Sequence, residues 1–287
     1  MKNFALIGAA GYIAPRHVEA IKTTGNNLSA ILDPYDGVGY IDKYFPQASY
    51  FSEAERFDRH LYRHKDEINF VSICSPNYLH DAHIRLALRN DCDVICEKPL
   101  VLKLEHLQSL SELEKDTGRK INTILQLRYH AAIIALKQKY KDTNKVHKIT
   151  LDYITPRGTW YKYSWKGDSD KSGGVASNIG VHFFDMLTWV FGPVESFEVE
   201  NGDLYSKGKL KLKNAEVDYN LSIDASHLPW SEWKAYRCIK IDGDELEFSD
   251  GFTELHNKSY QQILNGNGYG LVDIEPTIKL IEQIRNE

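Results

Sequence analysis

Apolar runs and helical patterns alternate along the first part of the chain, and they predict strands and helices in turn. Short apolar runs bounded by Gly, Pro, Ser or Asn are typical of buried strands, whereas longer segments with helical spacing are typical of helices. The predicted strands are residues 4–7, 28–32, 70–74, 93–96 and 121–127. The predicted helices are residues 15–22, 78–89 and 104–117. Strands that alternate with helices predict an α/β domain with a doubly wound parallel sheet.

The second half of the chain has a different pattern, in which strand signals follow one another. Residues 209–212, 217–223 and 237–241 predict strands, and residues 274–285 predict a final helix that we expect to pack back on the first domain. At about 150 residues per domain, 287 residues predict two domains. We place these domains at residues 1–122 and 123–287.

Composition restricts the class of protein and its partners. With 42% hydrophobic and 26% charged residues, the chain is expected to be soluble and globular. Its net charge of −5 gives no basic field for nucleic acid or an anionic membrane. An anionic ligand must therefore be held by local cations.

Cysteine usage and the first residues predict the compartment. Cys74, Cys92, Cys96 and Cys238 form no C-x-x-C pair and no zinc-ribbon spacing, so free thiols in a reducing cytoplasm and no metal site are expected. The first residues, MKNFALIGAAGYIA, include two glycines and lead to no cleavage site, so we expect no export signal. No run reaches the roughly 18 apolar residues that span a bilayer.

The first predicted strand is followed by a turn of small residues, Gly8-Ala-Ala-Gly11-Tyr12-Ile13-Ala14, and then by a helix. Such a turn allows the backbone to approach a pyrophosphate at the helix N-terminus. Its G-x-x-G-x-x-A spacing departs from the G-x-G-x-x-G fingerprint. Asp33 ends the next strand, where a carboxylate suits an adenosine ribose and repels a 2′-phosphate, so NAD is favoured over NADP. The alternative is an Asp-Pro turn in an unrelated α/β domain.

Other polar residues also follow predicted strands, where ligands of doubly wound sheets bind. Ser75-Pro76-Asn77 follows residues 70–74, and Glu97-Lys98-Pro99 follows residues 93–96. A lysine between a glutamate and a proline is either a solvated residue or an ammonium aimed at a ligand. The predicted cofactor-binding residues are Gly8, Gly11, Tyr12, Ile13, Asp33, Ser75, Pro76, Asn77, His80, Glu97, Lys98 and Gln126.

A second polar cluster lies on a predicted helix within residues 173–185. Asn178 and His182 are four residues apart, so an α-helix would place both on one face. A polar residue at that spacing can orient the imidazole and leave its other nitrogen available for proton transfer. The alternative is a histidine that only completes the core.

The glycine turn, the E-K-P triplet and the G-G…H-x-x-D helix occur in an order that resembles the Gfo/Idh/MocA family of sugar and polyol oxidoreductases, over nearly the whole chain. The resemblance implies a Rossmann domain followed by an α+β domain with a large open, mostly antiparallel sheet, and hydride transfer to NAD. It also implies a catalytic or substrate-orienting role for Lys98 and a proton-transfer role for His182. Many relatives have aspartate where this chain has Asn178, and a neutral amide cannot stabilise imidazolium. Lys98 is therefore expected to carry more of the proton transfer.

The chemistry explains why a lysine would be fixed at a strand end. Oxidation of a secondary alcohol removes a hydride from carbon while the hydroxyl proton departs, so a group must hold that oxygen. Lys98 can do both, and Pro99 restricts its backbone. Glu97 either orients the ammonium or caps the next turn.

Residues 157–166 contain four aromatic residues and three cations. Such a stretch could stack a base and neutralise a diphosphate or a carboxylate, or it could form a strand edge or subunit contact. The pattern R-G-x-W-Y…S-W-K-G-D resembles the WlbA/WbpB branch of the family, which implies oxidation of the 3-hydroxyl of UDP-N-acetylglucosaminuronic acid for surface-polysaccharide (O-antigen) synthesis. The predicted substrate-binding residues are Lys98, Arg128, Arg157, Tyr161, Tyr163, Trp165, Lys166, Asn178 and His182.

Two other functions remain open on the sequence. One is an NAD-dependent dehydrogenase of a free sugar or inositol, which would not need uridine and phosphate contacts. The other is a non-catalytic NAD sensor or scaffold. An exposed face of the second sheet predicts a homodimer or a homotetramer.

Overall fold

The computed structural model describes residues 1–141, 145–246 and 252–287. The chain divides into two compact units. The first comprises Met1–Gln126 and Thr253–Glu275, and the second comprises Leu127–Phe252 and Pro276–Glu287. The segment Thr253–Glu275 therefore belongs with the N-terminal unit although it follows most of the second unit in sequence.

The first unit is built on a six-stranded parallel sheet in the order β3-β2-β1-β4-β5-β6. Its strands are β1 (Asn3–Ile7), β2 (Asn27–Leu32), β3 (Ser49–Phe51), β4 (Ile68–Ile73), β5 (Asp93–Cys96) and β6 (Ile121–Thr123). This order confirms the predicted doubly wound sheet. The sequence did not predict β3, because this edge strand has only three residues and no buried side chain.

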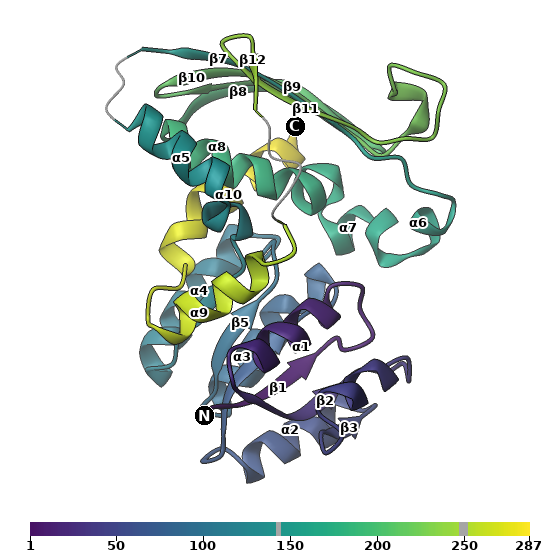
Figure 1. Ribbon diagram of the computed structural model, residues 1–287, viewed down its shortest axis with the longest axis vertical. Coiled ribbons are helices and arrows are strands. Elements are labelled where there is room, and N and C mark those ends of the chain that lie inside the picture. The colour runs from purple at the N-terminus through teal and green to yellow at the C-terminus, as the bar shows by residue number, and fades with distance from the viewer. Residues whose placement is uncertain (142–144, 247–251) are drawn as a thin grey trace. The chain divides into compact units, whose positions relative to one another are not determined.

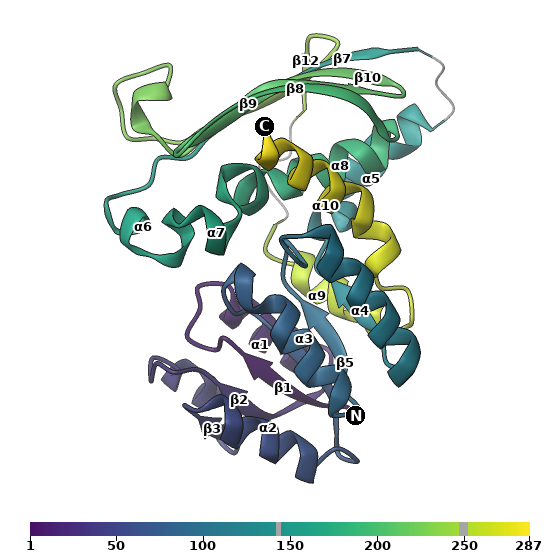
Figure 2. The same ribbon diagram turned by 180° about the vertical axis from the view of Figure 1, so that it is seen from behind.

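Helices cover both faces of this sheet. They are α1 (Ala14–Thr23), α2 (Ala54–Arg63), α3 (His80–Arg89), α4 (Leu104–Thr117) and α9 (Leu255–Leu264), with the 3-10 turns η1 (Gly39–Lys43) and η2 (Asn77–Leu79). Figures 1 and 2 show α1 and α9 on one face and α3 and α4 on the other. Tyr260 of α9 is fully buried against Phe4 of β1. The late segment therefore completes the core beside α1.

The second unit contains a six-stranded sheet in the order β12-β11-β7-β10-β9-β8. Its strands are β7 (His147–Ile154), β8 (Val194–Gly202), β9 (Tyr205–Leu212), β10 (Ala215–Ser222), β11 (Tyr236–Ile241) and β12 (Asp244–Glu245). β7 and β10 are parallel, whereas the other neighbours are antiparallel. The expectation of a mostly antiparallel sheet is confirmed.

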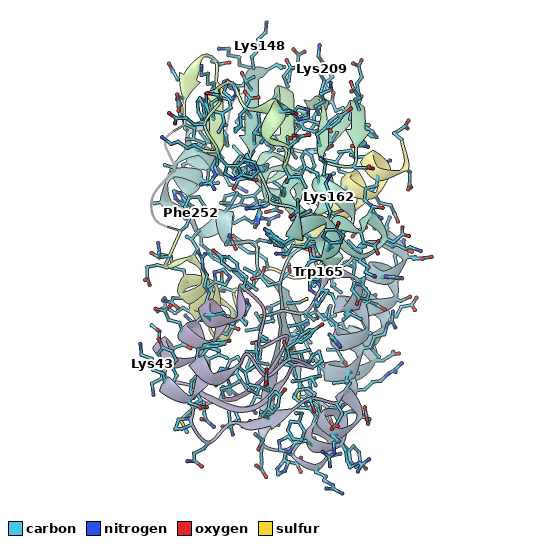
Figure 3. The ribbon with its side chains drawn as sticks, turned by 90° about the vertical axis from the view of Figure 1, so that its right-hand side faces the viewer. Lys43, Lys148, Lys162, Trp165, Lys209 and Phe252 are labelled. Carbon is cyan, nitrogen blue, oxygen red and sulfur yellow. The ribbon has the colours of Figure 1, made fainter. Side chains whose placement is uncertain are left out.

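One face of the second sheet is covered by α5 and α8 (Figures 1 and 2). The helical elements of this unit are η3 (Gln126–Tyr129), α5 (Ala131–Tyr140), α6 (Trp160–Tyr163), η4 (Trp165–Gly167), α7 (Ser169–Ser172), η5 (Ala176–Gly180), α8 (Val181–Phe191) and η6 (Ala225–His227). Lys148 and Lys209 lie on the opposite face and point away from the helices (Figure 3). Glu216 of β10 lies in register between Lys148 and Lys211, so charges of opposite sign alternate across this face.

The predicted final helix is α10 (Leu271–Asn286), and the division between the units falls within it, before Pro276. Its first residues group with the first unit and the rest with the second. Packing of the final helix on the first domain stays a prediction. In the described part of the chain, no helix is both long enough and apolar enough to cross a bilayer.

Candidate active site

A tight turn after β1 is possible only with glycine at its first position. Gly8 has φ +84, and a Cβ there would lie 2.5 Å from the backbone nitrogen of Ser75. The Gly11 N–H donates to the Gly8 carbonyl at 3.1 Å, and α1 begins three residues later. Tyr12 is exposed and Ile13 is half-buried at this point. Glycine at position 8 therefore allows this turn to pack directly against the backbone that follows β4.

The start of α1 suits an anion. Within the described residues, its first turn holds no acidic side chain and no side chain caps it. The helix dipole then favours a phosphate at this end. The turn and the helix together fit the pyrophosphate of a dinucleotide.

Asp33 follows β2 and lies beside the glycine turn. Its Oδ2 accepts from the Ala10 N–H at 2.8 Å, and its Oδ1 accepts from the Tyr35 N–H at 2.9 Å. A carboxylate has about four acceptor positions, so positions remain for ribose hydroxyls. The residue is only 5% exposed, so little water screens its charge. A second anion such as a 2′-phosphate would therefore be repelled. These contacts fit NAD.

The loop after β4 is tied to the loop after β5 by a histidine. Ser75 and Asn77 are buried and Pro76 is half-buried. Both ring nitrogens of His80 lie 2.8 Å from a carbonyl oxygen, one of Ser75 and one of Pro99. Burial lowers the pKa of His80, partly offset by these two bonds. The ring therefore links two predicted cofactor-binding loops.

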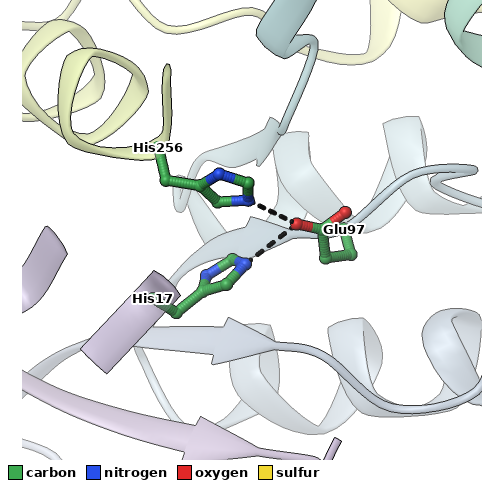
Figure 4. Close-up of side chains that lie close together, drawn as sticks. All are labelled: His17, Glu97 and His256. Atoms are coloured by element: carbon green, nitrogen blue, oxygen red, sulfur yellow. Dashed lines mark hydrogen bonds and ion pairs between the residues drawn. The ribbon is translucent and has the colours of Figure 1, made fainter. Parts of the chain in front are cut away.

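Glu97 follows β5 and is buried between two histidines (Figure 4). Its Oε1 accepts from Nε2 of His17 at 2.9 Å and from Nε2 of His256 at 3.0 Å. Its Oε2 accepts from the backbone N–H of Lys98 at 3.2 Å. Burial alone would raise the pKa of Glu97, but the two histidine bonds hold it well below its usual range. Glu97 is thus an ionised carboxylate fixed against the backbone of Lys98.

Lys98 itself is half-buried, and its peptide bond to Pro99 is cis. Sequence reasoning considered two roles for Glu97, orientation of the ammonium or capping of the next turn. The bond from the Lys98 N–H to Glu97 is a contact of the capping type. The sequence did not predict the two histidine bonds to Glu97.

The histidine partners of Glu97 extend the hydrogen bonding into the core. His17 Nδ1 lies 2.7 Å from the hydroxyl of Tyr260, which lies 2.6 Å from Oγ of Ser72 on β4. Burial lowers the pKa of His17, partly offset by its bond to Glu97. The four-residue spacing of His256 and Tyr260 could have indicated that both lie on one face of a helix. That helix, α9, was not predicted from the sequence.

Within the described residues, His17, Glu97 and His256 also form a group whose possible metal-binding atoms lie within 4.8 Å of one another. Each Nε2 is at hydrogen-bond distance from the same carboxylate oxygen. We therefore interpret the group as hydrogen-bonded.

The aromatic and cationic stretch of the second unit, residues 157–166, contains α6 and begins η4. Tyr161 is buried, whereas Arg157 and Tyr163 are exposed, the latter to 91%. Lys166 Nζ lies 5.7 Å from the ring centroids of both Trp160 and Trp165. Burial and the charge of Arg157 lower the pKa of Lys166. The stretch therefore offers cations and ring faces without forming a strand.

Asn178 and His182 lie at a junction of two helical geometries. Asn178 is in the π-helical turn η5, and His182 is in the first turn of α8. The shared face predicted from α-helical spacing therefore does not follow from the backbone. The side-chain amide of Asn178 donates to the Tyr161 hydroxyl at 3.0 Å, which brings two predicted substrate-binding residues together. Burial raises the pKa of Tyr161, partly offset by this bond.

Arg128 differs from the other predicted substrate-binding residues because it is buried in an ion pair. Its Nη2 and Nε donate to the two oxygens of Asp185 at 2.7 and 3.1 Å. Asp185 is the last residue of the H-x-x-D motif, and it was not predicted to pair with an arginine. In this structure, these two side chains are each less than a tenth exposed.

Each unit thus gathers its own predicted residues. Every predicted cofactor-binding residue lies in the first unit, following the end of a parallel strand. Lys98 belongs to the first unit, whereas Asn178 and His182 belong to the second. Joint action of these three residues stays a prediction.

Comparison with known families gives two matches. Residues 2–124 match the Gfo/Idh/MocA oxidoreductase family, NAD-binding Rossmann fold, and residues 143–223 match the C-terminal alpha/beta domain of the same family. A curated relative, glucose-6-phosphate 3-dehydrogenase of Bacillus subtilis, is 26% identical over 204 residues. That alignment covers 67% of this chain and 54% of the relative, so the match spans about half of the relative's length.

Solved structures give a closer likeness. The WlbA (WbpB) dehydrogenase from Thermus thermophilus, in complex with NAD and UDP-GlcNAcA, is 45% identical with a TM-score of 0.95. The alignment covers 99% of this chain and 95% of that chain. A structure of the Thermus dehydrogenase with NAD and alpha-ketoglutarate has the same identity and TM-score. The WlbA dehydrogenase from Bordetella pertussis is 19% identical with a TM-score of 0.82, over 99% of this chain and 94% of that one, and shares the fold.

Proposed function

Because the chain belongs to the Gfo/Idh/MocA oxidoreductase family, we propose that it is an NAD-dependent dehydrogenase of a UDP-sugar. The substrate that we propose is UDP-N-acetylglucosaminuronic acid, oxidised at its 3-hydroxyl to the 3-keto sugar in the cytoplasm, for surface-polysaccharide synthesis. The observation that carries this proposal is the 45% identity, over 99% of the chain, to a dehydrogenase solved with NAD and UDP-GlcNAcA.

Bound NAD would supply the hydride acceptor for this reaction. The glycine turn and the start of α1 would hold its pyrophosphate, because Gly8 permits the tight turn that leads into α1 and the helix end favours an anion. Asp33 would accept hydrogen bonds from the adenosine ribose. These assignments rest on the fit of residues in the first unit alone.

The proton of the reacting hydroxyl would be handled by Lys98. Its backbone is fixed by Glu97, and its half-buried side chain begins at the carboxyl edge of the sheet. As the hydride leaves the sugar carbon, Lys98 would hold the hydroxyl oxygen and take or pass on its proton. His182 would share this proton.

Recognition of the UDP group would rely on the second unit. Arg157 and Lys166 would neutralise the diphosphate or the uronate, and rings such as the exposed Tyr163 and the half-buried Trp165 would stack on the base. The bond from Asn178 to Tyr161 would hold the buried ring from which this segment extends.

The test is an assay of the purified protein with NAD and UDP-N-acetylglucosaminuronic acid. We expect reduced nicotinamide to form, with a sugar product that has lost two hydrogens by mass spectrometry and carries its carbonyl at C3. Parallel assays with free glucose, glucose 6-phosphate and inositol test the alternative on the same fold. Turnover of a free sugar alone would contradict the UDP-sugar proposal, and NAD binding without any turnover would favour a sensor.

We further propose that a 2-keto acid reoxidises the cofactor on the enzyme. The Thermus dehydrogenase solved with NAD and alpha-ketoglutarate supports this extension. The keto carbon would gain the hydride and its oxygen a proton, giving a 2-hydroxy acid. We expect 2-oxoglutarate to increase the amount of 3-keto sugar formed when NAD is present only in amounts equal to the enzyme. No increase would contradict this extension.

We also propose a homodimer or a homotetramer. The open face of the second sheet, with its alternating charges, supports contact with a second copy. Sedimentation equilibrium of the purified protein tests this, and a monomer at assay concentration would contradict it.

A further inference from the structure

Four elements of the first unit meet at Glu97. His17 comes from α1, His256 and Tyr260 from α9, Ser72 from β4, and Glu97 follows β5. All five side chains are buried. Figure 4 shows the two imidazole rings converging on one oxygen of Glu97. We call these five residues the Glu97 network.

One branch of the network runs from Glu97 through His17 and Tyr260 to Ser72. The charge of Glu97 determines which atom is the donor in each hydrogen bond of this branch. An ionised carboxylate only accepts, so His17 must donate from Nε2. A neutral ring then accepts at Nδ1 from the Tyr260 hydroxyl, which in turn accepts from Ser72. Each polar atom of this branch has at least one partner of the correct kind, which is the state in which buried polar groups stabilise a fold.

The other branch is a single donor. His256 donates from Nε2 to Glu97, and its Nδ1 has no hydrogen-bond partner among the described residues. A glutamine amide nitrogen can occupy the position of Nε2, and its side-chain oxygen is an acceptor, as Nδ1 is. His256→Gln therefore preserves the bond to Glu97, whereas His256→Leu removes it.

We propose that His17, His256 and Tyr260 are positioning residues that hold the Glu97 carboxylate against the backbone of Lys98. This inference rests on the proposed function, in which Lys98 handles the proton of the reacting hydroxyl. The network connects Lys98 to α1, the helix whose start would hold the pyrophosphate. It therefore fixes the origin of the lysine side chain relative to the cofactor-binding turn.

The network also keeps a negative charge beside Lys98. Other titratable groups around Glu97 are Cys74 after β4, Cys96 on β5 and His80 on α3. Burial raises the pKa of both thiols and of the Tyr260 phenol, so these three groups stay neutral. Glu97 is thus the ionised group of this cluster, bonded to the backbone N–H of Lys98.

The first experiment compares single-turnover NAD reduction and NAD affinity in two variants at one position. We expect His256→Leu to slow NAD reduction roughly 10- to 100-fold, because misplacement of a reacting group by about 1 Å can have this effect. NAD affinity should change by less than about threefold. His256→Gln should recover the rate to within about threefold of the parent. Leu110→Ala, a buried substitution in α4 outside the network, controls for general destabilisation.

The second experiment needs no substrate. The lysines are reductively methylated with carbon-13 formaldehyde, and the signal of Lys98 is identified by its loss in Lys98→Arg. In Glu97→Gln we expect the Lys98 titration midpoint to fall on the order of one pH unit, since a nearby negative charge is lost. His256→Gln should leave the midpoint unchanged.

The outcomes separate this inference from the proposed function. Absence of turnover in the parent would count against the UDP-sugar proposal but would leave the Lys98 titration as a valid test. Equal rates in His256→Leu and His256→Gln, or an unchanged midpoint in Glu97→Gln, would overturn the positioning role. Stoichiometric zinc in the purified parent, lost in His256→Leu, would also overturn it, because a metal would then join these residues.

Discussion

The Glu97 network and the stretch 157–166 hold their polar groups in opposite ways. In the network, side chains from α1, α9, β4 and the residue after β5 are buried and bonded to fixed partners. In the stretch, Arg157 is exposed in the irregular segment before α6 and Tyr163 is exposed on α6. Fixed buried groups suit a reaction that depends on geometry, whereas exposed cations and rings suit recognition of a charged nucleotide.

Arg128 shows that residue type alone does not decide whether a charged side chain is buried and paired or exposed. It belongs to the second unit, like Arg157, yet its guanidinium is buried against Asp185. Substitutions at buried, paired positions should therefore impair folding or chemistry, whereas substitutions at exposed positions should impair binding alone. The following predictions test this difference, beginning with the largest effect.

Lys98→Met should abolish most of the turnover while NAD binding is kept. The expected loss is on the order of 10²–10⁴-fold, as for removal of a general acid–base group. Single-turnover NAD reduction measures the loss, and calorimetry measures NAD affinity. Lys103→Met is a suitable control because Lys103 is exposed on the connection that follows. A near-normal rate in Lys98→Met would reduce the lysine to a structural residue.

Arg128→Ala should destabilise the second unit by about 3–5 kcal/mol, because it leaves Asp185 as a buried charge without this partner. Urea unfolding followed by tryptophan fluorescence measures the effect. Arg157→Ala is the matched control, and it should change stability by no more than about 0.5 kcal/mol. If both arginine variants lost the same stability, burial would not distinguish the two positions.

Arg157→Ala and Lys166→Ala should each weaken UDP-sugar binding by about 1–3 kcal/mol, the range for a charge-assisted hydrogen bond. Their unfolding midpoints should match the parent. Lys162→Ala is the control, since Lys162 is an exposed cation on α6, between Arg157 and Lys166 in sequence (Figure 3). Unchanged UDP affinity in both variants would assign the stretch to a contact between subunits.

The smallest effect concerns pH and the first unit. Burial lowers the pKa of His83 to about 4, below its unfolded value, and its Nδ1 lies 2.8 Å from Oγ of Ser75. Because the unfolded chain binds this proton more readily, stability should fall as pH drops below the unfolded value. Between pH 8 and pH 5.5 the loss should be roughly 1 kcal/mol.

Urea unfolding of the parent and of His83→Asn at the two pH values measures this contribution. The asparagine can keep the bond to Ser75 but does not titrate, so the variant should lose less stability at the lower pH. The same loss in parent and variant would show that other groups cause it.

Much of the fold could be predicted because its signals are local. The glycine turn at Gly8 and Gly11 lies between a strand and a helix, and those three parts are adjacent in sequence. The placement of Asp33 at the end of β2 also followed from the chain alone. β3 was missed because its three residues have no apolar run, and pairing with β2 defines it.

The site was less predictable where partners are distant in sequence. Glu97 bonds to His256, 159 residues away, and His17 bonds to Tyr260, 243 residues away. No spacing rule connects such residues. Asn178 and His182 were predicted to share a helical face, but the π-helical turn η5 removes the basis of that prediction.

The sequence by itself determined which chemical groups occur at strand ends and in the stretch 157–166, because local patterns fix strands, turns and helices. Only the tertiary structure decided the environment of each group. Arg128 and Arg157 are the same residue type 29 positions apart in sequence, yet one is buried in an ion pair and the other is exposed. The physical reason is that desolvation and hydrogen-bond partners depend on contacts between segments far apart in the chain.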